Sequence, residues 1–369
     1  MRAERIVARG FRNLADLDLS LPPGGAVFLG PNGHGKTNLL ELLYYPVLFR
    51  SLRGSRDVQI AAHGGIGFSL TLTLADGHRP RELAAGFSLA GKQKRLALDG
   101  APAERMSEAI GHWLAVAFLP TDLRLVQGPA AGRRQYLDRV LSLADRAYLH
   151  ALVRYRSALA QRNAALRQGR SELAGAFDSS LASTGAELVR RRLEWTRECT
   201  GRFAEECAGL GEPECMALSY RGDEALAEAE CWPAALDRAA ARDESRGMTT
   251  VGPHRHDLEL RLAGRTLREV GSTGQQRTAA VALKLCERET LAAASGSEPA
   301  LLLDDVFAEL DRERQDRLAA RLTGGGGARG APQTFITSPR EDELPESFHL
   351  VPLSVEAGRV SDGLGHLVA

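Results

Sequence analysis

The sequence has little that would place the protein in a membrane or outside the cell. It contains no run of about 18 apolar residues, the length that a membrane span requires. The charged start, Met1 to Arg12, lacks the apolar stretch of a secretory signal. The five cysteines are odd in number and include no Cys-x-x-Cys pair, so neither a disulfide scaffold nor a structural zinc site is indicated. We therefore expect a cytoplasmic protein with reduced cysteines and no membrane partner.

The sequence also lacks net charge, because 47 Lys and Arg balance 47 Asp and Glu. A nucleic-acid binder is often basic overall, but phosphate contact needs only local positive charge. From Gly132 to Arg170 many arginines are opposed only by Asp138 and Asp145. The candidate DNA contacts in this cluster are Arg133, Arg134, Arg139, Arg154 and Arg156. For any single arginine of this set, a solvated helix face is the alternative.

One glycine-rich stretch carries a specific chemical signal. It is Gly30-Pro31-Asn32-Gly33-His34-Gly35-Lys36-Thr37, which matches G-x-x-x-x-G-K-[ST]. The glycines allow backbone N–H groups to surround phosphate oxygens, Lys36 reaches the β- and γ-phosphates, and the Thr37 hydroxyl binds Mg²⁺. A chance match is improbable, because the chain has only four lysines and the motif stands between an apolar strand and a leucine-rich helix. ATP and Mg²⁺ are the expected cofactors.

A second candidate site follows the apolar run Leu301 to Leu303. Asp304 and Asp305 stand at its C-terminal end, where P-loop enzymes carry the Mg²⁺ carboxylate. We expect Asp304 to hold Mg²⁺ together with Thr37, and Asp305 to orient or deprotonate the attacking water. With Lys36 these are the candidate catalytic residues. The alternative is a strand end followed by a helix N-cap.

The third motif, Ser272-Thr273-Gly274-Gln275, precedes a helix expected from Gly274 to Ala294. Alone, a Ser N-cap would explain it. The order of P-loop, Ser-x-Gly-Gln and double carboxylate resembles the ABC-type ATPase superfamily. That resemblance implies that Ser272, Gly274 and Gln275 face the γ-phosphate bound to a second copy, which makes an ATP-sandwiched homodimer. It also implies a D-loop at Ala308 to Asp311.

The chain is organised around these motifs. Residues 3–9, 17–30 and 66–100 predict strands, 132–241 predicts a proline-poor helical block, and strands return after Met248. No heptad pattern is sustained, so no long coiled coil is expected. We predict an α/β fold: a P-loop ATPase head of ABC/SMC type, with a mixed sheet and flanking helices. Its core is expected from 1–130 with 245–369, and a helical insertion from 131–244.

The combination of stretches narrows the family. Thr37 and Ser272 are separated by 234 residues, more than in a transporter ATPase and far fewer than in an SMC protein. The stretches 10–14, 49–53, 119–129, 133–138 and 252–257 resemble the RecF family. This resemblance implies a weak ATPase that acts as a switch in recombinational DNA repair and replication. It implies ATP-driven dimerisation, binding to single- and double-stranded DNA at gaps, and loading of the recombinase RecA with RecR and RecO.

Some features depart from the superfamily pattern. Ser338 stands where transporter ATPases have a switch histidine, Thr273 replaces a signature glycine, and no Q-loop glutamine is found near Pro120. These departures favour a slow switch over a motor. The alternatives are an ATP-controlled scaffold without ATP-gated DNA binding, or another ABC-type subunit. The long, basic insertion disfavours a transporter subunit, and the Ser272 motif disfavours a small-molecule kinase.

Overall fold

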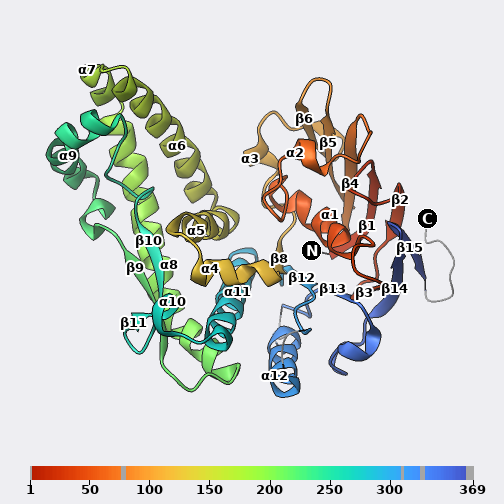
Figure 1. Cartoon of the computed structure of the whole chain (residues 1–369). Coiled ribbons are helices and arrows are strands. Elements are labelled where there is room, and N and C mark those ends of the chain that lie inside the picture. Colours follow the sequence, from red (N-terminus) through yellow and green to blue (C-terminus); the bar gives the residue numbers. More distant parts are fainter. Residues whose placement is uncertain (1, 76–79, 309–310, 325–328, 363–369) are drawn as a thin grey trace. The chain divides into compact units, whose positions relative to one another are not determined.

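The computed structural model describes residues 2–75, 80–308, 311–324 and 329–362. The chain divides into two compact units, which are considered separately (Figure 1). Unit 1 comprises 1–121 and 287–369, and unit 2 comprises 122–286. The expected insertion, 131–244, lies within unit 2. This unit also contains residues 122–130 and 245–286. The Ser272 motif therefore belongs to unit 2 and the P-loop to unit 1.

Unit 1 contains a mixed sheet in the order β15-β14-β3-β13-β12-β8. All its strands are parallel except β15, which pairs antiparallel with β14. The central strands β3, β12 and β13 are buried along almost their whole length, as expected of parallel strands covered on both faces. Its strands are β3 (Gly25–Leu29), β8 (Ala115–Phe118), β12 (Ala300–Asp304), β13 (Thr334–Ser338), β14 (Val351–Glu356) and β15 (Arg359–Asp362).

A second, antiparallel sheet in unit 1 has the order β2-β1-β4-β5-β6-β7. In β4, buried and more exposed residues alternate, as the Phe68 to Leu74 pattern predicts. Its strands are β1 (Arg2–Arg9), β2 (Leu17–Ser20), β4 (Gly67–Ala75), β5 (Arg81–Ser88), β6 (Gln93–Leu98) and β7 (Ala101–Pro102). Helix α1 (Lys36–Leu48) contacts strands of both sheets, which explains why most of its residues are buried. The other helices are α2 (Asp57–Ile60), α3 (Met106–Ala109), α12 (Arg312–Thr323), η1 (Pro120–Leu123) and η4 (Glu341–Glu343).

Unit 2 is mainly helical (Figure 1). Its helices are α4 (Arg124–Gln127), α5 (Ala130–Ala144), α6 (Arg146–Arg167), α7 (Ser171–Gly175), α8 (Asp178–Gly209), η2 (Glu224–Ala227), η3 (Ala229–Cys231), α9 (Trp232–Arg246) and α10 (Leu267–Val270). Helix α11 (Thr273–Ser295) begins in unit 2 and ends in unit 1. The longest helix of the described residues, α8, packs against α6 and β9, and the described part of the chain contains no long coiled coil.

The predicted helical block of 132–241 includes one strand that the sequence did not indicate. Residues Met216–Arg221 form strand β9, which pairs antiparallel with β10 (Asp257–Leu262). The short β11 (Arg265–Thr266) completes a three-stranded sheet. The alternation of buried Met216, Leu218 and Tyr220 with more exposed residues is the strand signal. It was obscured because the pairing partner lies beyond another helix.

A buried polar network fixes the segment that leads into β10. Arg192, only 2% exposed, donates hydrogen bonds to Asp138 Oδ1 at 2.6 Å, to Pro253 O at 2.7 Å and to Tyr148 Oη at 2.9 Å. The network therefore ties α5, α6 and α8 to the start of β10. A buried arginine whose donors are satisfied in this way specifies one arrangement of these elements.

Candidate nucleotide-binding site

The predicted P-loop connects β3 to α1. Gly30 has φ +147°, and a Cβ there would lie 2.2 Å from Val355 O, so the close approach to β14 requires glycine. The Lys36 ammonium donates to Gly30 O at 2.6 Å, Pro31 O at 3.1 Å and Asn32 Oδ1 at 3.2 Å. Lys36 is thus held inside the curve of the loop, at the positive N-terminal end of α1. That placement suits an anionic phosphate group.

The two expected Mg²⁺ ligands meet although 267 positions separate them. Thr37 Oγ1 donates to Asp304 Oδ1 at 2.8 Å, and Thr337 Oγ1 lies 2.9 Å from the same oxygen. Thr37 lies in the first turn of α1 and Asp304 ends β12, so the parallel sheet brings the strand end to the loop. Hydroxyl and carboxylate oxygens are suitable ligands for Mg²⁺. The residues present therefore fit a magnesium ion.

Asp305 occupies an unusual environment beside this pair. Its φ is +48°, and its N–H donates to Thr337 Oγ1 at 3.0 Å. Burial raises the pKa of Asp305 above its ordinary value, and the neighbouring charge of Asp304 adds to this shift, while Lys36 acts in the opposite direction. A cavity of about 10 Å³ lies beside the carboxylate, close to the smallest space that holds one water molecule. A partly buried carboxylate of raised pKa next to such a space suits a general base.

The sequence analysis missed Thr337. The parallel register places it opposite Asp304, and its hydroxyl contacts both acidic residues. The signal was its position at the end of an apolar strand, but strand register is not visible in the sequence. The neighbouring Ser338 turns away, because its hydroxyl donates to Arg340 O at 2.7 Å. Thr337 is therefore better placed than Ser338 to respond to the acidic pair.

A buried carboxylate on α1 joins two of the stretches that resemble RecF. Glu41, which is fully buried, accepts hydrogen bonds from Arg12 at 2.9 and 3.0 Å and from Arg53 at 2.5 Å. Burial would raise the pKa of Glu41, but the bonds from Arg12, Ser51 and Arg53 hold it below its usual value. Glu41 is therefore ionised and ties the segments 10–14 and 49–53 to the helix that follows the P-loop.

The turn between β14 and β15 contacts the P-loop directly. Gly358 N–H donates to His34 O at 2.9 Å, and Ala357 N–H donates to His34 Nδ1 at 3.3 Å. Gly358 O accepts from Ala15 N–H at 2.9 Å. Gly358 has φ +79°, and a Cβ there would lie 2.0 Å from Asn13 O. The strand hairpin therefore acts as a brace for the loop, and His34 contributes both its backbone and its ring.

We expect Gly358→Ala to weaken ATP binding by on the order of tenfold or more, because the turn must move away from Asn13 and the P-loop. The measurement is equilibrium titration with a fluorescent ATP analogue. Gly264→Ala is the matched control, since Gly264 has φ +78° but no atom near the added Cβ. Equal ATP affinity in Gly358→Ala and wild type would contradict the bracing role.

The Ser272 motif forms the N-terminus of the long helix α11. Ser272 Oγ accepts from Gln275 N–H at 3.2 Å, and Gln275 Oε1 accepts from Ser272 N–H at 2.9 Å, a reciprocal capping box. Gln275 Nε2 also donates to Glu212 Oε1 at 3.2 Å. Ser272 is exposed, and its hydroxyl proton remains free to donate. The helix start, including Gly274, is therefore capped and still open to a phosphate from outside.

One predicted feature falls partly outside the described residues. Of the expected D-loop, Glu309 and Leu310 lie outside them. Asp311 is described and caps α12, accepting from Arg314 N–H at 2.9 Å.

The candidate DNA contacts differ in what they touch. Arg133 forms a two-point ion pair with Asp257 at 2.7 and 2.8 Å and is 7% exposed. Its charge is neutralised by Asp257 in the interior of unit 2, which makes Arg133 a poorer candidate for a DNA contact than the exposed arginines. The others are placed as follows: Arg134 donates to His256 O, Arg139 lies over the Tyr136 ring, Arg156 pairs with Asp138, and Arg154 is exposed without a partner among the described residues.

Fold and site together define the class: a P-loop ATPase head of the ABC/SMC type. Relatives then specify the family. The chain is 39% identical to the DNA replication and repair protein RecF of Anaeromyxobacter sp. (strain Fw109-5), over 92% of each chain. It is 38% identical to that of Chloroflexus aurantiacus, over 98% of this chain and 99% of the relative. The chain belongs to the RecF family. No protein-family model matches it.

Solved structures agree with this assignment. The chain superposes on a recombination mediator protein RecF solved with ATP, described as part of the RecFOR pathway, with a TM-score of 0.88 and 27% identity over 98% of this chain and 97% of that one. The Smc head domain of Pyrococcus furiosus gives a TM-score of 0.57 at 15% identity over 97% and 95% of the two chains, which shows a shared fold. Within the described part of the chain, no helix has the length and apolar character of a bilayer span.

Proposed function

We propose that this protein is an ATP-dependent DNA-binding switch of recombinational repair and replication. Two copies close around ATP, bind single- and double-stranded DNA at gaps in the cytoplasm, and help RecR and RecO to load RecA. The observation that carries the proposal is the meeting of Thr37, Asp304 and Asp305 beside the Lys36 loop in a chain of the RecF family. Unit 1 is the ATPase core, and unit 2 presents the Ser272 motif and the DNA-contacting surface.

The residues divide the work at the site. Lys36 and the loop N–H groups neutralise and hold the β- and γ-phosphates. Thr37 and Asp304 would hold a magnesium ion, which would neutralise charge on the phosphates. Asp305 orients the attacking water and takes its proton, while the Thr337 hydroxyl bridges Asp304 and the Asp305 backbone and so positions both residues. Ser338 stands in place of a switch histidine, and its hydroxyl donates a hydrogen bond to Arg340 O. This suits a weak ATPase that acts as a switch.

The proposed homodimer is supported by the separation of the two motifs, because the Ser272 motif belongs to unit 2 and the P-loop to unit 1. Ser272, Gly274 and Gln275 form an exposed, capped helix start that can receive the phosphate bound by the partner's P-loop. Each ATP would then be sandwiched between two copies. This arrangement predicts that damage to the two motifs complements between subunits.

We expect Ser272→Arg to bind ATP normally but not to dimerise, because the arginine fills the space of the partner's phosphate. When the Ser272→Arg protein is mixed with the Lys36→Ala protein, heterodimers should form. Each heterodimer should have one intact composite ATP site, about half the number of a wild-type dimer, because Lys36 from one subunit meets Ser272 from the other. Analytical ultracentrifugation and ATP turnover of the mixture measure this. Ser179→Arg, at an exposed position on α8 in unit 2, is the matched control for an added arginine. Loss of ATP binding by Ser272→Arg, or no recovery on mixing, would argue for a different arrangement.

A further inference from the structure

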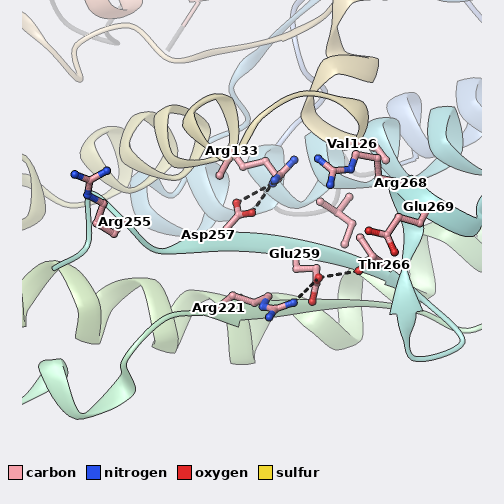
Figure 2. Close-up of a pocket in the computed structure, with 11 residues that line it drawn as sticks. Val126, Arg133, Arg221, Arg255, Asp257, Glu259, Thr266, Arg268 and Glu269 are labelled. Atoms are coloured by element: carbon pink, nitrogen blue, oxygen red, sulfur yellow. Dashed lines mark hydrogen bonds and ion pairs between the residues drawn. The ribbon is translucent and has the colours of Figure 1, made fainter. Parts of the chain in front are cut away.

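A pocket of about 430 Å³ lies in unit 2 (Figure 2). It is bounded by the start of α5, by strands β9 and β10, and by the short helix α10. Four arginines and three acidic residues line it: Arg133, Arg221, Arg255, Arg268, Asp257, Glu259 and Glu269. The balance of charge that meets solvent depends on which of these groups are already neutralised.

The carboxylate of Glu259 lies inside the protein, while its arginine partner Arg221 lies outside. The Glu259 side chain is 8% exposed and accepts from Arg221 at 3.0 Å, Arg261 at 2.8 Å and Thr266 at 2.9 Å. The Arg221 side chain, in contrast, is 60% exposed. Asp257 is matched by Arg133. Figure 2 shows both carboxylates turned toward these guanidinium groups. The polar face of β10 therefore presents net positive charge to solvent.

Two further arginines on this lining have no acidic partner among the described residues. Arg255 is exposed, and its guanidinium donates only to Thr249 O at 3.2 Å and to Met248 Sδ. Arg268 is exposed and its side chain makes no hydrogen bond or ion pair in the described chain. The neighbours of Arg255 add no charge, because burial lowers the pKa of His254 to about 4 and of His256 to about 3. Only Glu269, also exposed, opposes the two arginines.

We propose that Arg221, Arg255 and Arg268, termed here the β10 arginine face, bind backbone phosphates of DNA. Guanidinium groups match phosphate oxygens in geometry and stay charged at all physiological pH values. The strand also provides a rigid base of suitable length: at about 3.3 Å per residue, its six residues run along roughly 17 Å. Duplex DNA rises 3.4 Å per base pair, so this face spans about five base pairs of backbone.

DNA is favoured over an acidic peptide by the lining itself. The apolar contribution is small, from Val126, Ala130 and Leu260, so no hydrophobic anchor site for a peptide side chain is evident. Arg133 also lines the pocket, but it adds no charge to the face because Asp257 neutralises it. This inference rests on the proposed DNA-binding function. It places DNA contacts on Arg221, Arg255 and Arg268, which lie outside the arginine cluster of 132–170.

The test removes the two unmatched charges with Arg255→Gln/Arg268→Gln, which leaves no carboxylate orphaned. Affinity for a labelled gapped duplex, with ATP and Mg²⁺, is expected to fall on the order of tenfold at about 0.1 M salt. The slope of log K against log salt should become shallower by about 2, one for each phosphate that is no longer bound. Arg238→Gln/Arg246→Gln removes the same charge from exposed positions on α9 and should bind like wild type.

Two more variants separate charge from structure. Arg255→Lys/Arg268→Lys retains the charge and should keep most of the affinity, whereas Glu269→Gln should tighten binding, an effect that a purely structural role does not predict. Thermal unfolding and ATP-dependent dimerisation should be unchanged in all of them. If the glutamine pair binds DNA like wild type, this face does not contact DNA and is open to an acidic protein segment. If the wild-type protein itself binds no DNA, both the proposed function and the role of the β10 arginine face are contradicted.

Discussion

Lys36→Ala is expected to lose ATP-dependent dimerisation completely. The ammonium group lies within the P-loop, 2.6 Å from Gly30 O, where no other described lysine can replace it. Charge-assisted hydrogen bonds contribute about 1.5–3 kcal/mol each, so the loss of two of them weakens ATP binding by about 100-fold or more. Without a neutralised triphosphate, two subunits cannot close on it. Fluorescent-nucleotide titration and ultracentrifugation with ATP measure the two effects.

Lys92→Ala is the matched control for this variant. Lys92 is exposed in the turn between β5 and β6, outside the P-loop. Its replacement by alanine removes the same charge from a different part of the chain. The control should bind ATP and dimerise like wild type. A Lys36→Ala protein that dimerises fully with ATP would rule out phosphate neutralisation as the cause of closure.

Asp305→Asn is expected to lower ATP hydrolysis by about 10² to 10⁴, the usual contribution of a general base, while ATP still binds. The dimer should therefore persist longer after ATP is added. Phosphate release under single-turnover conditions measures the loss, and Asp342→Asn, an exposed acidic position, serves as control. Hydrolysis at the wild-type rate in Asp305→Asn would remove Asp305 from the chemistry.

The raised pKa of Asp305 gives this residue a pH signature as well. The ionised form is the active base, so hydrolysis should be present above the pKa and fall as the pH drops through it. This acidic limb should lie above the value of about 4 expected for an unperturbed aspartate. Because the folded-state pKa is raised, ionised Asp305 costs stability at neutral pH, and this cost disappears as the pH falls. Asp305→Asn should therefore melt at a higher temperature than wild type at pH 7.

The sequence predicted most of the nucleotide site because its signals are local. Eight contiguous residues from Gly30 to Thr37 define the P-loop. The apolar run before Asp304 predicts a strand end there, even when the neighbouring strands of the sheet are not known. Contacts that depend on register were not predictable. Thr337 opposes Asp304 only through the β12–β13 pairing, and Gly358 reaches His34 only through a hairpin more than three hundred residues along the chain.

The helical unit shows the same division. Its long helices follow from composition, but β9 depends on a partner strand and was missed. The arginine cluster was inferred from the density of arginines in the sequence, which cannot distinguish Arg133, neutralised by Asp257 across 124 positions, from the exposed Arg154. Charge becomes informative only when each partner is known, and that is why the β10 arginine face emerged from the structure.

Binding of gapped and duplex DNA, with and without ATP and Mg²⁺, by wild type and Lys36→Ala tests the central claim most directly. The account predicts that ATP strengthens wild-type binding, that the variant loses this gain, and that higher salt weakens the complex steeply. DNA binding that is absent, or equal with and without ATP in a protein that still binds nucleotide, would contradict the switch. It would leave an ATP-controlled scaffold for protein partners as the better account.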